Sequence, residues 1–510
     1  MFLISIMMWG EHMSLMKLKS GTDIRGTAMG ENTDLTDEAI RKITAGFVAT
    51  IREKTGCEPT DMTVAVGHDS RLSAERIKKN VIEVLSFYGV KVLDCGLSST
   101  PAMFMTTIEA GCTASVQITA SHHPWDKNGL KFFTKDGGFE SEDIIKILEY
   151  AEKADVAEIG NCDNSQKLGF MKTYADILCR MICEGINAEN YDKPLEGFRI
   201  VTDAGNGVGG FYALDVLQKL GADISGSRYL DPDGSFPNHA PNPENKEAMK
   251  SVSEAVIQSG ADFGVIFDTD VDRAACVDEN GKEINRNSLV ALASAIALEN
   301  NQGGTIVTDS VTSDGLKKFI EENLGGKHHR FKRGYKNVIN EAIRLNKEGI
   351  NCPLAIETSG HAALRENYFL DDGAYLITKI IILLANLRKE GRKIGDMIGE
   401  LKQPAEEKEL RFRILCDDFR LYGNDVISAL EKYASDRDGW TVSDDNREGI
   451  RISLDENHGN GWMLLRLSVH DPILPFNAES DSVGGVDKIT EEFYNFIKEF
   501  KNLDLSVFEK

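Results

Sequence analysis

The sequence lacks an excess of positive charge. It has 58 Lys and Arg residues against 81 Asp and Glu residues, so its formal net charge is -23. A strongly negative surface repels nucleic acid phosphates and anionic membrane surfaces. We therefore expect neither nucleic acid nor membrane as a partner, and an anionic small-molecule ligand would require a local group of basic residues.

Cysteine pairs with the CxxC spacing are also absent. The nine cysteines contain no CxxC motif, and an odd number of scattered thiols fits a reducing compartment. Cys179 and Cys183 share a helical face at spacing i, i+4, but no histidine accompanies them. We interpret them as core residues rather than metal ligands, and we expect a cytoplasmic protein.

No hydrophobic run is long enough for a membrane span. Residues 374–387 form an apolar run of 14 residues that contains Lys379, which is too short and too polar to cross a bilayer. We predict a buried helix there. Residues 1–9 are apolar but lack a basic flank and a small-residue cleavage site, so we do not interpret them as a signal peptide.

The 510 residues are 41% hydrophobic and 27% charged, as in a globular protein too long for a single core. Three segments repeat one pattern, in which an apolar strand ends in aspartate and a polar turn leads to an amphipathic helix. The strands are expected at residues 63–69, 199–203 and 305–309, and the helices at 75–88, 211–220 and 315–324. The pattern predicts three tandem related α/β domains.

The last hundred residues follow a different pattern. Residues 403–409 (QPAEEKE) are typical of a charged linker, and short strands are expected at residues 411–415, 441–444, 449–454 and 462–468. Helices are expected at residues 425–434 and 486–500, which predicts a C-terminal α+β domain. We place the four domains at residues 1–193, 194–302, 303–405 and 406–510.

Residues 119–131 (TASHHPWDKNGLK) place a hydroxyl group beside two imidazoles. Ser121 is followed by His122 and His123, and Pro124 stops regular structure directly after them. Ser121 is thus expected in a loop at the end of a strand. Serine beside histidine is a weak signal alone, because the base of a nucleophile is usually distant in sequence, and an ordinary polar turn is the more frequent explanation of such a site.

Three carboxylates follow the apolar strand FGVIF at residues 263–267. Asp268, Asp270 and Asp272, in DTDVDR, stand at every second residue, a spacing that lets their oxygens converge on a hard cation such as magnesium. An EF-hand loop begins similarly, but Arg273 occupies the sixth position, where glycine is needed. An acidic loop without a metal is the alternative, although adjacent carboxylates repel one another unless they are neutralised.

Three further motifs carry weaker signals. Residues 205–210 (GNGVGG) match GxGxxG after a strand, but no acidic residue is suitably placed for a ribose, so a tight strand-to-helix turn explains them better. No GxxxxGK[ST] motif occurs. Residues 357–361 (ETSGH) suit sugar hydroxyls, and residues 466–472 (RLSVHDP) suit phosphate, although ordinary polar loops would explain both.

Taken together and in this order, these motifs resemble those of the α-D-phosphohexomutases, the phosphoglucomutase and phosphomannomutase family. The resemblance rests on SGTDIRG (residues 20–26), VGHDSRLS (66–73), TASHHPWDKNGLK, DPDGSFPNHAPNP (231–243), DTDVDR and ETSGH. It spans nearly the whole chain and implies four domains around a central cleft.

The resemblance also implies roles for individual residues. The catalytic set is Ser121, which would carry the phosphoryl group, with His122, Arg25, Lys131 and His361, of which Lys131 and His361 are candidates for the general acid or base. The metal set for Mg²⁺ is Ser121, Asp268, Asp270 and Asp272. The substrate set is Glu357, Ser359 and Gly360 for the sugar, Arg273 for the reacting phosphate, and Arg466, Ser468 and His470 for the other phosphate.

The implied reaction interconverts hexose 1-phosphate and hexose 6-phosphate, of mannose or glucose or both, with hexose 1,6-bisphosphate as activator. His123 stands where the family commonly has asparagine, and the RLSVHDP loop departs from the family's SGTEP or SNTEP. A phosphoglucosamine mutase, a silent sugar-phosphate sensor and a serine hydrolase remain as alternatives.

Overall fold

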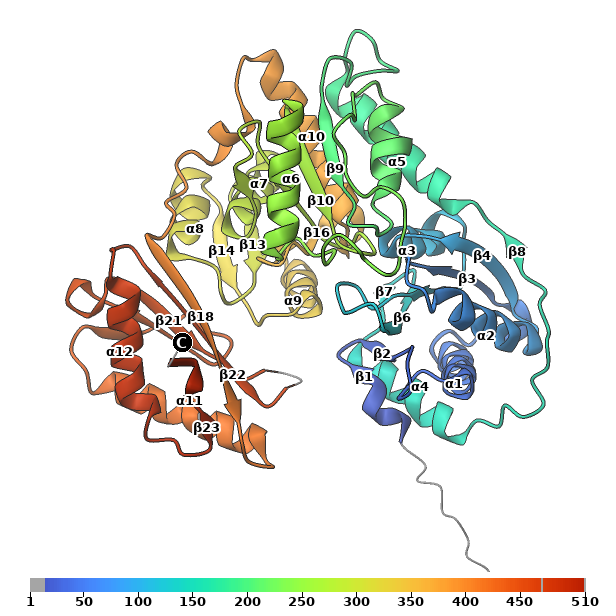
Figure 1. Cartoon of the computed structure of the whole chain (residues 1–510), viewed down its shortest axis with the longest axis horizontal. Coiled ribbons are helices and arrows are strands. Elements are labelled where there is room, and N and C mark those ends of the chain that lie inside the picture. The colour runs from blue at the N-terminus through green and yellow to red at the C-terminus, as the bar shows by residue number, and fades with distance from the viewer. Residues whose placement is uncertain (1–13, 469–470, 509–510) are drawn as a thin grey trace, which may run out of the picture. The chain divides into compact units, whose positions relative to one another are not determined.

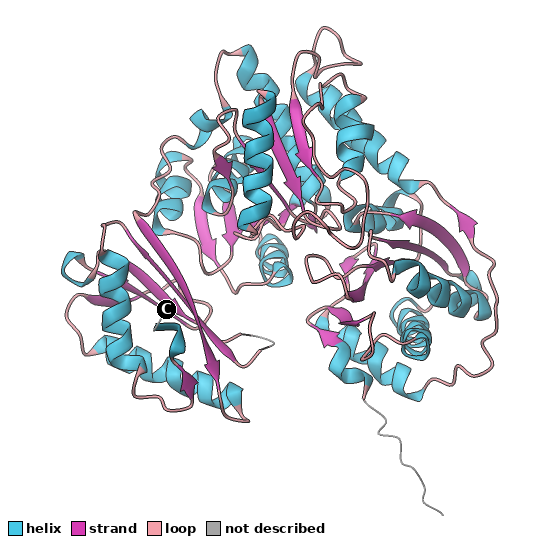
Figure 2. Cartoon of the chain, viewed as in Figure 1, coloured by secondary structure: helices cyan, strands magenta, loops and turns pink. Residues whose placement is uncertain are grey.

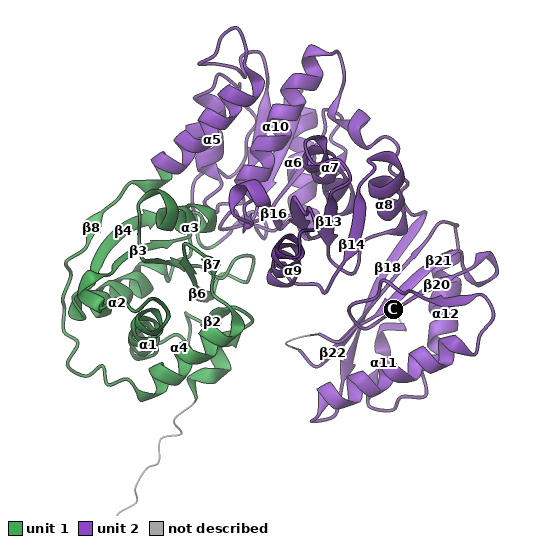
Figure 3. Cartoon of the chain, turned by 180° about the vertical axis from the view of Figure 1, so that it is seen from behind, with its two compact units in different colours: residues 1–171, 233–235 green, residues 172–232, 236–510 purple. Residues whose placement is uncertain are grey.

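The computed structural model describes residues 14–468 and 471–508. The chain forms two compact units, shown in separate colours in Figure 3, and each is described by itself. The first contains the described residues up to 171 together with residues 233–235, and the second contains residues 172–232 and those from 236 onward. Within the described residues, no helix is long and apolar enough to cross a membrane.

The first unit is an α/β domain built on one mixed sheet (Figure 1). Its strands have the order β1-β2-β6-β5-β3-β4-β8, with β7 paired to β6. The strand bounds are β1 Lys19–Ser20, β2 Asp23–Thr27, β3 Thr63–His68, β4 Lys91–Leu97, β5 Ala114–Ile118, β6 Lys127–Thr134, β7 Gly137–Gly138 and β8 Gln166–Lys167. The helices are α1 Asp37–Thr55, α2 Ala74–Phe87, α3 Thr100–Glu109 and α4 Ser141–Lys153.

The core of this unit lies between the sheet and three helices. Buried residues of α1, α2 and α4 form one apolar cluster with the strands, while α3 contacts β3, β5 and β6. Strands β3, β4 and β5 are parallel, and β6 runs antiparallel to β5 with Ile118 opposite Leu130. The β5 to β6 connection, which carries Ser121, therefore starts at the carboxyl end of the parallel strands, where α/β folds place their sites.

The second unit begins within α5 (Phe170–Ile186) and contains two more α/β sheets. One has the order β12-β11-β10-β9 and the other β14-β13-β15-β16-β17. Their strands are β9 Ile200–Asp203, β10 Phe263–Phe267, β11 Ala274–Val277, β12 Glu283–Ile284, β13 Thr305–Thr308, β14 Lys327–Arg330, β15 Leu354–Ile356, β16 Ala362–Leu364 and β17 Leu370–Asp371. The helices are α6 Lys246–Ser259, α7 Asn287–Glu299, α8 Asp314–Lys318, α9 Tyr335–Lys347 and α10 Gly373–Lys389.

The three expected strand-to-helix repeats are present. Strands β3, β9 and β13 lie where predicted, and the first is followed by the α-helix α2. The helical segments expected at residues 211–220 and 315–324 include π-helical turns, at Tyr212–Gln218 and Phe319–Asn323. The apolar run at 374–387 is confirmed as the buried helix α10, and the nine cysteines are free thiols.

The C-terminal part is an α+β domain, as expected, with an antiparallel sheet covered by two helices (Figure 2). The strand order is β19-β20-β21-β22-β18-β23, with bounds β18 Glu406–Ile414, β19 Trp440–Val442, β20 Ile450–Leu454, β21 Gly461–Leu465, β22 Ile473–Ser480 and β23 Leu503–Asp504. Helices α11 (Phe419–Ser435) and α12 (Gly485–Ile497) share its apolar core.

One prediction for this part was wrong, and one long strand was not predicted. The charged segment at residues 403–409 is not a linker throughout, because β18 begins at Glu406. Along this strand exposed positions alternate first with partly buried ones and then with the buried Phe412 and Ile414. Four of the charged side chains are tolerated there because they lie in the exposed row of the strand, namely Glu407, Glu409, Arg411 and Arg413. Strand β22 was missed, because Pro475 and several polar residues interrupt its apolar pattern.

Candidate active site

Ser121 lies in the loop between β5 and β6 of the first unit. It is 3% exposed, and its φ of 49° lies in the left-handed region that few non-glycine residues adopt. The Thr119 hydroxyl accepts a hydrogen bond from the Ser121 N–H at 2.9 Å. The Ser121 Oγ lies 3.4 Å from Nδ1 of His122, whose ring stacks on that of His123. The loop therefore has a defined geometry in which the serine hydroxyl and an imidazole are adjacent.

Arg25 and Lys131 are brought together beside this loop by the pairing of β2 with β6, where Arg25 lies opposite Gly129. Gly129 is required here, because a Cβ would come within 2.4 Å of the Ile24 carbonyl oxygen. Asp23, which the sequence analysis did not single out, lies with its Oδ2 2.7 Å from Nη2 of Arg25 and 4.0 Å from Nζ of Lys131. One buried carboxylate thus holds both predicted cationic residues.

Asp268, Asp270 and Asp272 converge within the second unit, in the loop after β10. All three are fully buried, and their carboxylate oxygens lie within 4.8 Å of one another. Val271 has a φ of 68°, which turns the chain so that carboxylates on both sides of it face the same space. Burial, followed by the neighbouring Asp272 charge, raises the pKa of Asp268 well above its usual value.

These residues fit a hard divalent cation. Magnesium prefers carboxylate oxygens, and a dication would offset the repulsion among the three groups. Arg273 is 1% exposed and donates from its Nε to Asp268 at 3.1 Å and from its backbone N–H to the same carboxylate at 3.2 Å. Ser121, the fourth predicted ligand, belongs to the other unit, so its place in the metal site stays a prediction.

The GNGVGG turn packs directly against the backbone of the aspartate loop at Thr269. A Cβ at Gly207 would come within 2.6 Å of the Thr269 carbonyl oxygen, and the backbone N–H of Val208 donates to that oxygen at 2.8 Å. Glycine is therefore needed for close backbone approach. This geometry supports the interpretation as a tight turn instead of a dinucleotide site.

The ETSGH loop lies directly against the aspartate loop within the second unit. His361 forms a β-bridge with Arg273, and Gly360, at a φ of 95°, would place a Cβ 2.7 Å from the Ala274 carbonyl oxygen. Glu357 and Ser359 are buried in the same turn. The predicted sugar-binding residues and the carboxylate cluster thus form one continuous group.

Two neighbours of His361 escaped the sequence analysis. Asp371 places its Oδ2 3.1 Å from Nδ1 of His361, and the ring of Tyr335 stacks on the imidazole at 5.1 Å between centroids. A carboxylate bonded to one ring nitrogen fixes the orientation of the imidazole and leaves the other nitrogen for chemistry. Asp371 ends β17, but the chain offers no local motif that would have marked it.

Of the predicted phosphate residues in the last domain, Arg466 has the clearest setting. Its side chain is 12% exposed and its Nη1 lies 3.8 Å from Oε1 of Glu448. The same Glu448 accepts hydrogen bonds from the Ser310 hydroxyl at 2.6 Å and from the Arg333 N–H at 3.1 Å. Burial lowers the pKa of Arg466.

The rest of the RLSVHDP loop is less informative. The Ser468 hydroxyl accepts from the Asp471 N–H at 3.2 Å, and His470 lies outside the described residues. Arg333 is a second, partly buried arginine near Arg466, and its basic context in FKRGYKN could have drawn attention to it.

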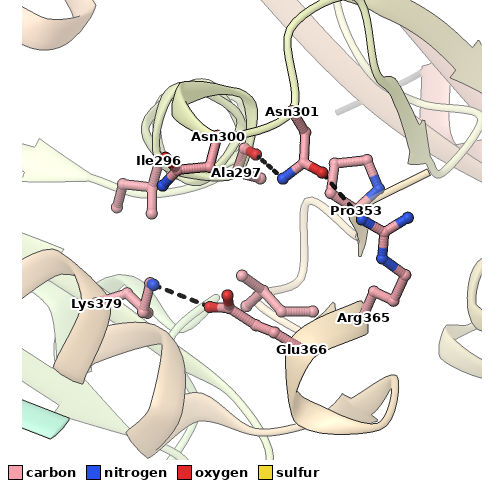
Figure 4. Close-up of a pocket in the computed structure, with 9 residues that line it drawn as sticks. Ile296, Ala297, Asn300, Asn301, Pro353, Arg365, Glu366 and Lys379 are labelled. Carbon is pink, nitrogen blue, oxygen red and sulfur yellow. Dashed lines mark hydrogen bonds and ion pairs between the residues drawn. The ribbon is translucent and has the colours of Figure 1, made fainter. Parts of the chain in front are cut away.

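The pocket in Figure 4 is not a candidate for the substrate. It lies among α7, α10 and the turn after β16 and has a volume of about 60 Å³, which is small against the roughly 300–1,000 Å³ typical of ligand sites. An ion pair between Lys379 and Glu366 at 2.9 Å lies across it. None of the predicted site residues lines it.

Three family models match the chain in sequence. They describe the α/β/α domains I, II and III of phosphoglucomutase/phosphomannomutase and match residues 16–157, 179–281 and 285–404. Together they cover the Ser121 loop, the aspartate loop and the ETSGH loop.

Similar proteins carry related names. A phosphoglucomutase/phosphomannomutase of Thermococcus kodakarensis is 31% identical over 470 residues, which cover 91% of this chain and 95% of the relative. A phosphomannomutase/phosphoglucomutase of Pseudomonas aeruginosa is 28% identical over 85% of this chain and 87% of its own. A probable phosphoglucosamine mutase of Methanopyrus kandleri is 27% identical over 86% of this chain and 90% of its own.

Solved structures share the fold. A phosphoglucomutase/phosphomannomutase family protein of Burkholderia thailandensis superposes with a TM-score of 0.76 at 24% identity, covering 94% of this chain and 97% of that one. The Paramecium phosphoprotein parafusin, in its open form, gives a TM-score of 0.70 at 16% identity and covers 94% of each chain. With three matching domain models and a relative above 30% identity across most of both chains, the protein belongs to the phosphoglucomutase/phosphomannomutase family, the α-D-phosphohexomutases.

Proposed function

We propose that the protein is a phosphohexomutase that interconverts hexose 1-phosphate and hexose 6-phosphate of mannose, glucose or both. The observation that carries this proposal is the group of three buried carboxylates within 4.8 Å of one another, joined by the β-bridge from Arg273 to the ETSGH loop. Carboxylates suited to a dication, joined by a β-bridge to a polar turn suited to sugar hydroxyls, favour phosphoryl transfer to a sugar over a serine hydrolase, whose chemistry requires no carboxylate cluster.

In the proposed reaction, the Ser121 Oγ carries the phosphoryl group. The bond from phosphorus to Oγ breaks as a bond forms to a hydroxyl oxygen of the sugar phosphate, and the proton of that hydroxyl passes to a base, for which Lys131 and His361 are the candidates. The bisphosphorylated sugar then reorients in the site and transfers its other phosphoryl group to Ser121. Hexose 1,6-bisphosphate would therefore phosphorylate Ser121 and activate the enzyme.

The remaining residues have binding roles. Asp268, Asp270 and Asp272, with Ser121, would hold Mg²⁺, which supplies charge neutralisation of the phosphoryl group when bound. Arg273 and Arg25 would neutralise the reacting phosphate, Glu357 and Ser359 would bind sugar hydroxyls, and Arg466 with Ser468 and His470 would bind the second phosphate. Positioning and electrostatics supply most of the rate enhancement in phosphoryl transfer.

Mass spectrometry tests the carrier directly. The purified protein is incubated with Mg²⁺ and glucose 1,6-bisphosphate, and its peptides are examined for an added phosphoryl group. We expect the modification on Ser121 and none in the Ser121→Ala variant, which should also lack mutase activity. An unmodified Ser121 under conditions that label a known mutase would favour a sugar-phosphate sensor instead.

The same assay resolves the sugar. A relative of similar identity is named as a probable phosphoglucosamine mutase, so exchange of the phosphoryl group with Ser121 is measured for mannose, glucose and glucosamine phosphates.

We also propose that the enzyme is cytoplasmic and that its four domains are divided near residues 193, 302 and 405.

A further inference from the structure

No residue of the VGHDSRLS motif has a role in the reaction described above. Its arginine, Arg71, nevertheless contacts the backbone of the Ser121 loop. The Arg71 side chain is fully buried, and its guanidinium donates hydrogen bonds to four backbone carbonyl oxygens of this loop. The acceptors are those of Ser121, His123 at 2.6 Å, Pro124 at 2.6 Å and Lys127 at 2.9 Å. Arginine suits this task, because five N–H donors in a rigid fork can satisfy several acceptors at once.

Asp69 connects this guanidinium to the other side of the loop. Its carboxylate accepts from the backbone N–H of Arg71 at 2.9 Å, from Nε of Arg71 at 3.2 Å and from the Thr119 hydroxyl at 2.7 Å. Because the Thr119 hydroxyl donates its hydrogen to Asp69, its lone pairs can accept from the Ser121 N–H, at 2.9 Å. Ser121 is thus held at its N–H by Thr119 and at its carbonyl oxygen by Arg71.

Residues 233–235 pack against the backbone of the segment that carries Arg71. They belong to the first unit although they come from the DPDGS stretch much later in the chain. A Cβ at Gly234 would lie 2.3 Å from the Ser70 carbonyl oxygen and 2.6 Å from Cα of Arg71. The backbone that presents Arg71 is therefore covered closely, which limits its freedom to shift.

This network has a consequence for Ser121. A non-glycine residue persists in the left-handed region only where its surroundings hold it there, and Ser121 has a φ of 49°. Both backbone polar groups of Ser121 are bonded to the network, so its Cα to Cβ direction is set by Thr119 and Arg71. The position of Oγ follows from that direction and from one side-chain rotation.

We propose that Asp69, Arg71 and Thr119 are positioning residues for phosphoryl transfer. They hold Ser121 in its left-handed conformation, so that Oγ keeps one place whether or not it carries the phosphoryl group. The proposal rests on the proposed function, in which Ser121 is the carrier. It goes beyond that function by assigning the rate of transfer to three side chains that bind neither the substrate nor the metal.

Substitutions at Thr119 separate positioning from folding. Thr119→Val removes the hydroxyl with little change in volume, and Thr119→Ser restores it. Thr44→Val is the matched control, because Thr44 is equally buried in the first unit and bonds only to a helix carbonyl in the described contacts, that of Ile40 at 2.8 Å. Amide hydrogen exchange over residues 119–127 and the single-turnover rate of Ser121 phosphorylation by glucose 1,6-bisphosphate are measured in each variant.

We expect faster exchange in the loop of Thr119→Val than in Thr44→Val, with kcat and the phosphorylation rate lowered about 100-fold, as a displacement near 1 Å can cause. KM should stay within about twofold, and Thr119→Ser should recover most of the rate. Arg71→Lys should act like Thr119→Val, whereas Arg76→Lys should not, although Arg76 also donates to two backbone carbonyl oxygens, of Ala28 and Leu35.

The outcomes are distinguishable. If wild-type Ser121 accepts the phosphoryl group and the folded Thr119→Val and Arg71→Lys variants do so at the same rate, the positioning role is refuted while the proposed function stands. Unchanged exchange in the loop, or a Thr119→Ser variant as slow as Thr119→Val, also refutes it. If wild-type Ser121 is never phosphorylated, the proposed function fails and this inference fails with it.

Discussion

Replacing Asp23 by Asn would test whether one carboxylate organises the cationic side of the Ser121 loop. Asp23 is 3% exposed, and it is the shared partner of Arg25 at 2.7 Å and Lys131 at 4.0 Å. Asn has nearly the same shape and keeps an oxygen acceptor, but it removes the negative charge between two cations. The substitution therefore changes electrostatics and geometry with little change in volume.

The magnitude follows from the contacts. A hydrogen bond to a charged group contributes about 1.5–3 kcal/mol, and a neutral acceptor keeps part of this, so we expect a loss of about 1–2 kcal/mol in unfolding free energy. At about 2–4 °C per kcal/mol for a domain of this size, the melting temperature of the first domain should fall by roughly 2–8 °C. Displacement of Arg25 and Lys131 should lower kcat by about 100-fold.

Calorimetry and single-turnover phosphorylation of Ser121 measure the two effects. Asp34→Asn is the matched control, since Asp34 also pairs with a lysine, Lys17 at 2.6 Å, and accepts from the backbone of β2, at 3.1 Å from the Thr27 nitrogen. It should be destabilised to a similar degree and keep its activity. If Asp23→Asn turned over within twofold of Asp34→Asn, the assignment of Arg25 and Lys131 to one carboxylate-held pair would be wrong.

Three further predictions concern the second unit. Chelation of divalent cations should stop phosphorylation of Ser121. Mg²⁺ should stabilise the wild-type protein against thermal unfolding by about 2.7 kcal/mol at a hundredfold excess over Kd, and Asp270→Asn should abolish this stabilisation, whereas the buried control Asp278→Asn should keep it. Equal stabilisation of the two variants would contradict the metal site. Asp371→Asn should lower kcat about 10–100-fold with little change in KM, because the tautomer of His361 is no longer fixed, and a wild-type kcat would exclude that role. Burial raises the pKa of Glu479 to about 7 from 4.5, so between these pH values the folded state retains a proton that the unfolded chain releases. The free energy of unfolding should therefore fall as pH rises through this range, by at most about 3 kcal/mol. Glu479→Gln should flatten this dependence and melt at a higher temperature than wild type at pH 8, and identical pH profiles of the two proteins in calorimetry would refute the prediction.

Much of the fold could be predicted because its elements follow local patterns. Strands β3, β10 and β13 are short apolar runs that end beside aspartate or histidine, and helix α10 is a predominantly apolar segment. The two errors occurred where tertiary context overrides the local signal. Strand β22 contains Pro475, yet it pairs with β21 on one side and with β18 on the other, where Arg411 lies opposite Pro475. Strand β18 can carry many charged residues because one row of its side chains faces solvent.

The candidate site divides in the same way. The sequence by itself determined which residues are candidates for catalysis and metal binding. A hydroxyl in a loop after a strand and carboxylates at every second residue can both be recognised in short motifs. Only the tertiary structure decided what holds them, since Asp23, Arg71 and Asp371 act through partners brought near by strand pairing and loop packing. A hydrogen bond depends on distance and direction in space, and motif spacing along the chain encodes neither for residues in different elements.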